Sequence, residues 1–267
     1  MRALSFITGL VRVGFVAAWS IVLISLALVL TVLTWNRDLP LVMARRIWAR
    51  GVIWATGMRY RLDPLPTFDP SVPHVFVMNH QSMLDIPCAF ACIPTNLRFV
   101  AKDVLRYVPF LGWYMWITGM IFVDRSRGTK ALRSLARAAE RIRKGASVLV
   151  FPEGTRSRDG TILPFKRGPF VLALQAAVPI VPVAIAGSGQ VLPPGGMRLR
   201  SGEVRLKMGR PIPTAGRPRQ ASEQLMQEIR AALIDLHAQI AGPPPVRTPE
   251  SPGAPGDTGV LRELAKP

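Results

Sequence analysis

The feature that most constrains this chain is a long apolar run near its amino terminus. No charged residue interrupts positions 13–36, and a helix of about 20 mostly apolar residues is long enough to cross the hydrocarbon core of a bilayer. A cleaved signal peptide would have a shorter apolar region followed by a small-residue cleavage site. The flank Trp35-Asn36-Arg37-Asp38 offers no such site. We therefore predict that residues 1–61 form a membrane anchor.

The anchor has two possible arrangements. Residues 41–60 mix Trp48, Ile53, Trp54 and Met58 with arginines, a composition that suits the membrane interface. The anchor is then either one transmembrane helix or a helical hairpin inserted in one leaflet. More arginines follow the apolar run than precede it, so the positive-inside rule predicts a protein of the cell (inner) membrane whose remaining part faces the cytoplasm.

The charge of the chain points to the same environment. Lysine and arginine number 34 against 16 acidic residues, giving a net charge of +18, and 49% of the residues are hydrophobic. Such a composition favours an anionic membrane surface. A nucleic-acid binder is the other class that this charge permits, but the tryptophans cluster in the apolar amino-terminal region and no nucleic-acid fold signature is present. We expect membrane lipid, and no nucleic acid, as a partner.

Residues 62–240 alternate between strand-like and helix-like patterns. Strands are expected at 75–78, 147–150, 180–186 and 203–208, and helices at 129–144, 169–177 and 222–240. This alternation is typical of an α/β domain. We predict a single domain with a mixed, largely buried β-sheet flanked by helices. Residues 241–267 are rich in proline and glycine and are predicted to be disordered.

A histidine and a carboxylate follow the first of these strands. His80 and Asp85 are five positions apart, whereas two residues on one helix face are separated by three or four. His80 therefore belongs in a turn and Asp85 in the first turn of the next helix, with Ser82 as the N-cap. A carboxylate beside a histidine fixes its tautomer and suits it to remove a proton. The alternative is that Asp85 only caps the helix.

A second polar turn follows the strand at 147–150. Its residues are Glu153, Gly154, Thr155 and Arg156. Because ligands bind beyond the carboxyl ends of strands in open α/β sheets, both turns are expected to border one crevice. Gly154 permits close backbone approach, and the nearby cations Arg156, Arg158, Lys166 and Arg167 suit a phosphate. The alternative for these cations is a solvated basic loop.

Four segments in this order resemble conserved blocks of the glycerophospholipid acyltransferase family, specifically the 1-acyl-sn-glycerol-3-phosphate acyltransferases. They are residues 79–85, 119–125, 151–157 and 178–184. Lys102 is similar to a lysine that this family often carries after the next strand. The resemblance spans roughly residues 72–210, and four ordered blocks are far more specific than any one.

The resemblance implies transfer of a fatty acyl group from acyl-CoA or acyl carrier protein to the sn-2 hydroxyl of 1-acyl-sn-glycerol-3-phosphate, giving phosphatidic acid. It implies that His80 is the general base, that Asp85 orients it, and that no acyl-enzyme forms. Substrate-binding residues implied by the matching blocks are Asn79, Ser82, Lys102, Arg125, Glu153, Gly154, Thr155 and Arg156. The alternatives are an acyltransferase for another lysolipid, such as a lysophospholipid or lyso-ornithine lipid, and a non-catalytic membrane adaptor.

Two other chemistries find no support in the sequence. The chain has no Gly-x-Ser-x-Gly nucleophile elbow, and its only cysteines, Cys88 and Cys92, lie in an apolar stretch typical of a buried helix face. The four ligands of a structural zinc site are not visible. We expect no metal, and no cofactor besides the thioester co-substrate.

Overall fold

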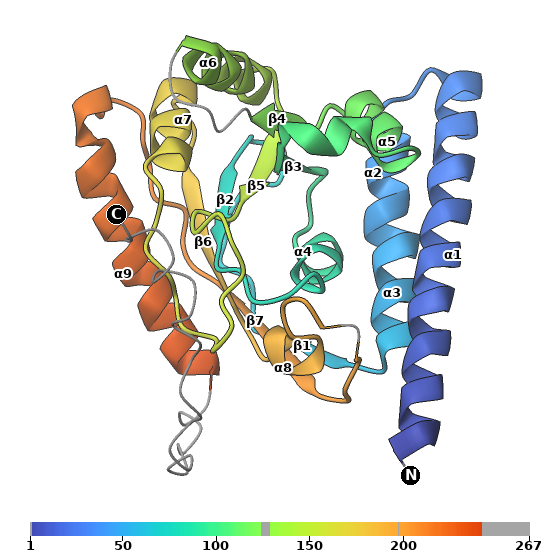
Figure 1. The fold of residues 1–267 in the computed structure, drawn as a ribbon. Helices are drawn as coiled ribbons and strands as arrows, with labels where there is room; N and C mark the ends of the chain where they lie inside the picture. Colours follow the sequence, from blue (N-terminus) through green and yellow to red (C-terminus); the bar gives the residue numbers. More distant parts are fainter. Residues whose placement is uncertain (1, 124–128, 197, 242–267) are drawn as a thin grey trace, which may run out of the picture.

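The computed structural model describes residues 2–123, 129–196 and 198–241, and Figure 1 shows its elements. The strands are β1 (Arg59–Leu62), β2 (Val75–Met78), β3 (Leu97–Lys102), β4 (Ile121–Val123), β5 (Ser147–Val150), β6 (Ile180–Ala186) and β7 (Glu203–Met208). The helices are α1 (Arg2–Thr34), α2 (Leu39–Met43), η1 (Ala44–Trp48), α3 (Ala49–Thr56), α4 (Asp85–Cys92), η2 (Asp103–Tyr107), α5 (Leu111–Ile117), α6 (Thr129–Arg143), α7 (Gly168–Ala176), α8 (Ser188–Val191), η3 (Arg219–Ala221) and α9 (Ser222–Ile240).

The strands form one mixed sheet. Their order is β1-β7-β6-β2-β5-β3-β4. β6 and β7 pair antiparallel, and every other neighbouring pair is parallel. The prediction of a mixed sheet flanked by helices is confirmed, and the four expected strands have the bounds that the sequence indicated. β2 and β5 lie inside the sheet and every residue of both is buried, as expected for parallel strands covered on both faces.

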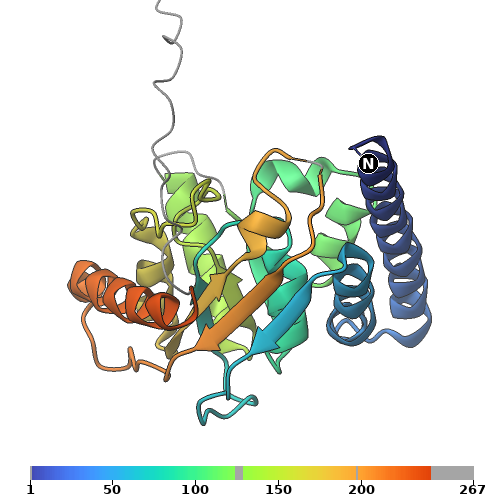
Figure 2. The ribbon, with the colours of Figure 1, turned by 90° about the horizontal axis from the view of Figure 1, so that it is seen from below.

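Alternate residues of β2 face two different layers of helices. Phe76 and Met78 pack in a core with α3, α4 and α5, while Val75 and Val77 pack in a second core with α6, α7 and α9. This separation follows from the two-residue period of a strand. Figure 1 shows α6, α7 and α9 on one side of the sheet and α4 and α5 on the other, and Figure 2 shows the sheet from below between these layers. The domain therefore has an α/β/α sandwich architecture.

The amino-terminal helices form a hairpin. α1 ends at Thr34, and Asn36 Oδ1 then accepts the backbone N–H groups of Asp38 and Leu39, which starts α2. The arms are joined by Trp48, whose indole N–H donates to Ser20 Oγ at 2.9 Å. Figure 1 shows α1 at the outer edge of the molecule, with α3 between it and α4. The first arm of the hairpin is α1, and the second arm comprises α2, η1 and α3. The hairpin is therefore packed against the α/β domain along its second arm.

The second arm differs from its sequence expectation. Ile53 and Met58 were expected at the membrane interface, but both are buried in the core that α3 shares with α4. Trp48 packs edge-on against Phe90 of α4, whereas Trp54 remains largely exposed. The difference arises because one face of this arm packs against an apolar surface of α4. The residues on that face contact protein instead of lipid.

α1 keeps an unpartnered apolar surface. Within Thr8–Thr34, an 18-residue window has a mean hydropathy of 2.6, and only 17% of that window is buried. By length and composition this segment can cross a membrane. This exposed apolar surface indicates association with a membrane.

The predicted domain limits fall close to structural features. β1 begins at Arg59 and pairs with β7, so the sheet starts slightly before the expected limit at residue 62. Residues 242–267, for which disorder is predicted, lie outside the described residues.

Candidate active site

Two loops meet where parallel strands β2 and β5 end. Glu153, after β5, accepts the backbone N–H of His80 at 3.1 Å through its Oε1 atom. The backbone N–H of Ser157 in turn donates to the His80 carbonyl at 2.7 Å. The carboxyl ends of adjacent parallel strands lie at one sheet edge, so segments 73 residues apart are brought together there.

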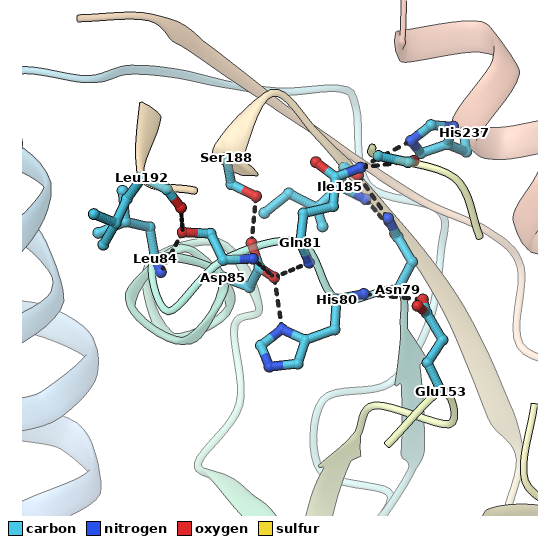
Figure 3. A network of polar contacts seen from close by, with 12 residues as sticks. Asn79, His80, Gln81, Leu84, Asp85, Glu153, Ile185, Ser188, Leu192 and His237 are labelled. Carbon is cyan, nitrogen blue, oxygen red and sulfur yellow. Dashed lines mark hydrogen bonds and ion pairs between the residues drawn. The ribbon is translucent and has the colours of Figure 1, made fainter. Parts of the chain in front are cut away.

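His80 and Asp85 are in direct contact. His80 Nδ1 lies 2.7 Å from Asp85 Oδ2, and Asp85 is completely buried while the His80 side chain is 14% exposed. Figure 3 shows the imidazole directed at this carboxylate from the loop before α4. With a proton on Nδ1 donated to Asp85, Nε2 carries a lone pair. Phe151 stacks on the imidazole at a centroid distance of 3.9 Å and so limits its rotation.

Asp85 accepts three further hydrogen bonds. The backbone N–H groups of Gln81 and Ser82 donate to Oδ2 at 2.7 and 2.8 Å, and the Ser188 hydroxyl donates to Oδ1 at 2.5 Å. The first two of these bonds fix the backbone of the loop just before α4. Asp85 therefore holds the loop before α4 and contacts His80 at the same time, so the two sequence interpretations are not exclusive.

Ser82 is not the N-cap that the sequence indicated. α4 begins at Asp85, with Leu84 in the N-cap position, because Met83 and Leu84 form an intervening turn. The Ser82 hydroxyl donates to the Leu192 carbonyl at 2.8 Å and accepts the Leu84 N–H at 3.2 Å. Ser82 is fully buried, and the bonds of its hydroxyl hold the loop in place. Its predicted contact with a substrate stays a prediction.

Asn79 also supports the loop, and its predicted substrate contact stays a prediction. Its Nδ2 donates to the Ile185 carbonyl at 2.9 Å, and its Oδ1 accepts the Ile185 N–H at 2.8 Å. The side chain is 1% exposed. Asn79 thereby extends the hydrogen bonding between β2 and β6 by one step and fixes the point at which the His80 loop leaves the sheet.

Glu153 is a buried carboxyl group with one unpaired oxygen. It is 4% exposed, and Oε2 meets no hydrogen-bond partner among the described residues. Burial raises the pKa of Glu153 from its ordinary 4.5 to about 7, against the lowering effect of the His80 N–H bond, and the nearby Asp85 carboxylate raises it further. The group is thus poised between its neutral and charged forms near neutral pH.

This raised pKa makes a prediction about stability. A carboxyl group whose pKa is higher in the folded state binds a proton more tightly when folded, so its contribution to stability is present below pH 4.5 and is lost as the pH rises to about 7. The full effect is on the order of 3 kcal/mol. We expect the difference in Tm between the two proteins, wild type minus Glu153→Gln, to decrease as the pH rises from 4.5 to about 7. Thermal unfolding at a series of pH values measures it.

Glu140→Gln is the matched control for that experiment. Glu140 is exposed on α6, and its pKa is lowered by Arg143, so its titration lies below the window in which Glu153 titrates. If the Tm difference from the wild type did not change with pH for either variant, the result would contradict a raised pKa at Glu153.

The remaining predicted site residues lie at the carboxyl end of β3 and in the turn after β5, except Arg125. Lys102 is exposed at the carboxyl end of β3, the same sheet edge as Glu153. Gly154 has a φ of +71°, and a Cβ there would meet Lys166 Cε at 2.9 Å, so the turn requires glycine. Thr155 is exposed and Arg156 is half-buried. Arg125 lies outside the described residues.

Of the other expected cations near this loop, one has a structural partner. Arg167 Nε donates to Ser222 Oγ at 2.6 Å, which ties the end of the loop to the start of α9. Arg158 and Lys166 are exposed. The loop therefore carries solvated cations beside the half-buried Arg156, as both sequence interpretations allow.

The two cysteines are buried thiols on α4. Burial raises the pKa of Cys88 far above its ordinary value and that of Cys92 to about 12, so both stay protonated and poorly nucleophilic. In the described part of the chain, no three His, Cys, Asp or Glu side chains gather as they would around a metal ion. The absence of a metal or cofactor from the reaction stays a prediction.

Comparison with known proteins identifies the family. The sequence model of the Acyltransferase family matches residues 60–186. The chain is 30% identical over 231 residues to the 1-acyl-sn-glycerol-3-phosphate acyltransferase alpha of Homo sapiens, an alignment that covers 86% of this chain and 81% of the human protein. The chain belongs to the acyltransferase family. The four blocks that carried the resemblance lie in or beside the region of the family match.

Two fungal relatives of this acyltransferase family member are also named acyltransferases. It is 43% identical over 169 residues to an uncharacterised acyltransferase of Schizosaccharomyces pombe, and 35% identical over 177 residues to a 1-acyl-sn-glycerol-3-phosphate acyltransferase of Saccharomyces cerevisiae. These alignments cover 62% and 65% of this chain, and they span about three-fifths of the relatives, 61% and 58% of their lengths.

A solved structure has the same fold. The crystal structure of the acyltransferase PlsC from Thermotoga maritima superposes with a TM-score of 0.79 at 23% identity, covering 91% of this chain and 100% of that one. At this identity the match supports the arrangement of the elements in the acyltransferase domain and of the helices before it.

Some residues around His80 were not anticipated as part of this acyltransferase site. Ser188, which contacts Asp85, follows the carboxyl end of β6, and the sheet-edge rule could have found it. Gln81 Nε2 contacts the Gly160 carbonyl and His237 Nε2, each at 3.2 Å, as Figure 3 shows for His237. His237 is 156 positions away, and no local pattern links the two.

Proposed function

We propose that this protein transfers a fatty acyl group from a thioester donor, acyl-CoA or acyl carrier protein, to the sn-2 hydroxyl of 1-acyl-sn-glycerol-3-phosphate. The product is phosphatidic acid, a precursor of phospholipids. The observation that carries the proposal is the 2.7 Å contact between His80 Nδ1 and the buried Asp85, beside the loop at Glu153–Arg156. The relatives in yeast and human that bear this activity in their names support it.

In the proposed mechanism His80 acts as a general base. Its Nε2 takes the proton of the acceptor hydroxyl while Asp85 stabilises the imidazolium that forms. The acceptor oxygen bonds to the thioester carbonyl carbon, and the tetrahedral intermediate collapses with cleavage of the carbon–sulfur bond. The imidazolium then returns the proton to the departing thiolate. The protonated state of Cys88 and Cys92 supports a direct transfer without an acyl-cysteine.

The acceptor's polar groups fit the loop after β5. Arg156 is a half-buried guanidinium at the sheet edge that bears His80, and a guanidinium fork suits a phosphate. Glu153 has a free oxygen, Oε2, that can bond a glycerol hydroxyl. We assign the phosphate to Arg156, with Lys102, Arg125, Gly154 and Thr155 as further contacts, and the glycerol to Glu153.

Arg156→Ala tests the phosphate assignment. Loss of one charge-assisted hydrogen bond of about 1.5–3 kcal/mol lowers kcat/KM by about 10- to 100-fold. We expect this loss for an acceptor with a phosphate monoester and a much smaller one for a monoacylglycerol that lacks phosphate. Arg158→Ala, at an exposed neighbouring arginine, should behave as the wild type. Equal losses with both acceptors would contradict the assignment.

An acyl-transfer assay tests the function itself. Purified protein is given labelled acyl-CoA or acyl carrier protein with a panel of lysophospholipids and a lyso-ornithine lipid, and thioester consumption is measured beside His80→Ala. We expect phosphatidic acid to form at the highest kcat/KM, only with His80 present. Preference for another lysolipid would replace the acceptor, and no product with any pair of substrates would favour a non-catalytic adaptor.

The hairpin is proposed to lie in one leaflet of the cell (inner) membrane, with the domain in the cytoplasm. Exposed apolar side chains line α1, among them Ile21, Val22 and Val29, and they suit contact with lipid. The second arm carries the exposed Arg46 and Arg50 midway along its length, where a spanning hairpin would place charges in hydrocarbon. Since that arm also packs on the domain, a spanning α1 would draw the domain into the bilayer.

Cysteine labelling tests this topology. Leu10→Cys and Asn36→Cys place thiols at exposed positions near the two ends of α1, while Cys88 and Cys92 are buried. In proteoliposomes, a membrane-impermeant maleimide should reach both new thiols from the side that bears the domain. Labelling of either one by reagent enclosed on the opposite side would show that α1 spans the bilayer.

A further inference from the structure

A cavity lies at the opposite end of the sheet from His80. It has a volume of about 670 Å³. Its wall includes Asn96, Gly119 and Ala146, which lie just before β3, β4 and β5. These strands are parallel, so the cavity is at their amino ends, whereas His80 and Glu153 follow the carboxyl ends of β2 and β5. The cavity is therefore separate from the proposed active site.

Positive charge dominates this cavity, which we call the cationic cavity. One carboxylate, Asp38, lines it, and Asp38 Oδ1 accepts from Arg98 Nη2 at 2.9 Å. The basic residues of the wall are Arg37, Arg45, Arg98, Arg141 and Lys144. Five cations minus one carboxylate leave an excess of four positive charges. Lys144 also lies 3.5 Å from Glu140, outside the cavity wall, in an exposed pair that contributes little.

Several of these cations are held in place by the protein. Arg98 Nε donates to the Thr118 carbonyl at 3.0 Å, and Arg141 Nη1 donates to the Gly119 carbonyl at 3.2 Å. Both carbonyls lie just after α5, so the two guanidinium groups converge there. Arg45 Nε is buried and meets no hydrogen-bond partner among the described residues. A buried donor without a partner is costly, and an anion in the cavity would satisfy it.

The surroundings indicate what kind of anion fits. Trp116 lines the cavity and is 74% exposed, and Trp35, two residues before Arg37 in the hairpin turn, is 89% exposed. Exposed tryptophans are typical of the level of lipid headgroups. The cavity lies where the turn between the hairpin arms meets the domain, since Arg37 and Asp38 belong to that turn. Phosphate groups of the lipid surface would therefore lie at the height of the cavity.

We propose that the cationic cavity binds the phosphate of an anionic membrane lipid headgroup, at a site distinct from the acyl acceptor site. Guanidinium groups bind phosphate oxygens through paired hydrogen bonds, and basic residues are attracted to an anionic lipid surface. Binding there anchors the turn of the hairpin and holds the domain at a fixed height on the membrane. The site does not depend on the identity of the transferred acyl group.

Fluorescence titration tests this proposal with the full-length protein in a nonionic detergent. The probe is dihexanoyl phosphatidylglycerol, which is neither substrate nor product of the proposed reaction. Trp116 in the cavity wall is the reporter, and Trp116→Phe should remove most of the fluorescence change. Dihexanoyl phosphatidylcholine and inorganic phosphate form the comparison arms. We expect saturable binding of phosphatidylglycerol and much weaker binding of the other two.

Charge reversal at exposed positions of the cavity supplies the variants. Arg37→Glu combined with Lys144→Glu should weaken phosphatidylglycerol binding by at least about 10-fold, because two cationic contacts become repulsive. Arg137→Glu combined with Arg219→Glu is the control, since both arginines are exposed outside the cavity and the change in net charge is the same. The control should change binding by less than about 2-fold, as expected for a surface charge change at a distance.

Three results would overturn the proposal. Equal weakening in both double variants would mean non-specific attraction by net charge. Inorganic phosphate that binds as tightly as phosphatidylglycerol would make the cavity a site for a soluble phosphate compound. A fluorescence change that does not saturate would mean that there is no site. Acyl transfer is not the readout, so none of these results bears on the proposed reaction.

Discussion

We expect replacement of His80 by alanine to lower acyl transfer by at least about 10²-fold, the usual contribution of a general base. The reason is that Nε2 of this imidazole is the group proposed to take the acceptor's proton, while its Nδ1 is committed to Asp85 at 2.7 Å. Turnover with saturating acyl-CoA and acceptor measures the loss.

The fold should survive this change. The His80 side chain is 14% exposed and bonds to Asp85 through Nδ1. The backbone bonds to Glu153 and Ser157 remain in the variant. Circular dichroism and Tm should therefore stay close to those of the wild type. His237→Ala is a matched control at the only other histidine near the site, and it should keep most of the activity. Near-normal turnover by folded His80→Ala would refute the general-base role.

We expect replacement of Asp85 by asparagine to lower both activity and stability. Asp85 is fully buried and accepts from His80, Gln81, Ser82 and Ser188. An asparagine NH2 group cannot accept these bonds, and each buried donor left without a partner costs about 1–3 kcal/mol. We expect a loss of about 2 kcal/mol or more, hence a Tm lower by about 4–8 °C. Acyl transfer should fall nearly as far as in His80→Ala, because the imidazole loses its orienting carboxylate.

Ser188→Ala separates the two effects of Asp85. It removes one of the four donors and leaves the contact with His80 in place, so both Tm and turnover should fall by less than in Asp85→Asn. Parallel measurements of Tm and kcat for the three variants check this order. If the Tm of Asp85→Asn equalled that of His80→Ala, the result would contradict the role of Asp85 in stabilising the loop before α4.

Much of the fold was predictable because its signals are local. The strands at Val75–Met78 and Ile180–Ala186 are short apolar runs ended by polar turns, and the structure reproduces their bounds. α6 follows its apolar spacing to Arg143 and closes at Gly145, which has a φ of +100°. Both signals depend on neighbours within a few positions of the chain, so they can be read without the partner elements.

What the sequence could not show are the partners of residues that act over long distances in the chain. Asn79 and Ser82, for which substrate contact stays a prediction, bond to the backbone of Ile185 and Leu192, more than 100 positions away. Ile53 was expected in the membrane interface and lies instead against the α4 layer. A polar or apolar side chain has the same sequence signal whether its partner is solvent, lipid or protein.

The sequence by itself determined the helical hairpin's apolar arm, the α/β class and the pair His80 and Asp85, because hydrophobic period and motif spacing are properties of contiguous residues. Only the tertiary structure decided that Asp85 also binds Ser188 and that Glu153 is buried with a raised pKa. It also decided that five cations, from the hairpin turn, the second arm, β3, α6 and the residue after α6, surround one cavity. The physical reason is that burial and electrostatic interaction depend on distance in space, which folding sets between segments far apart in the chain.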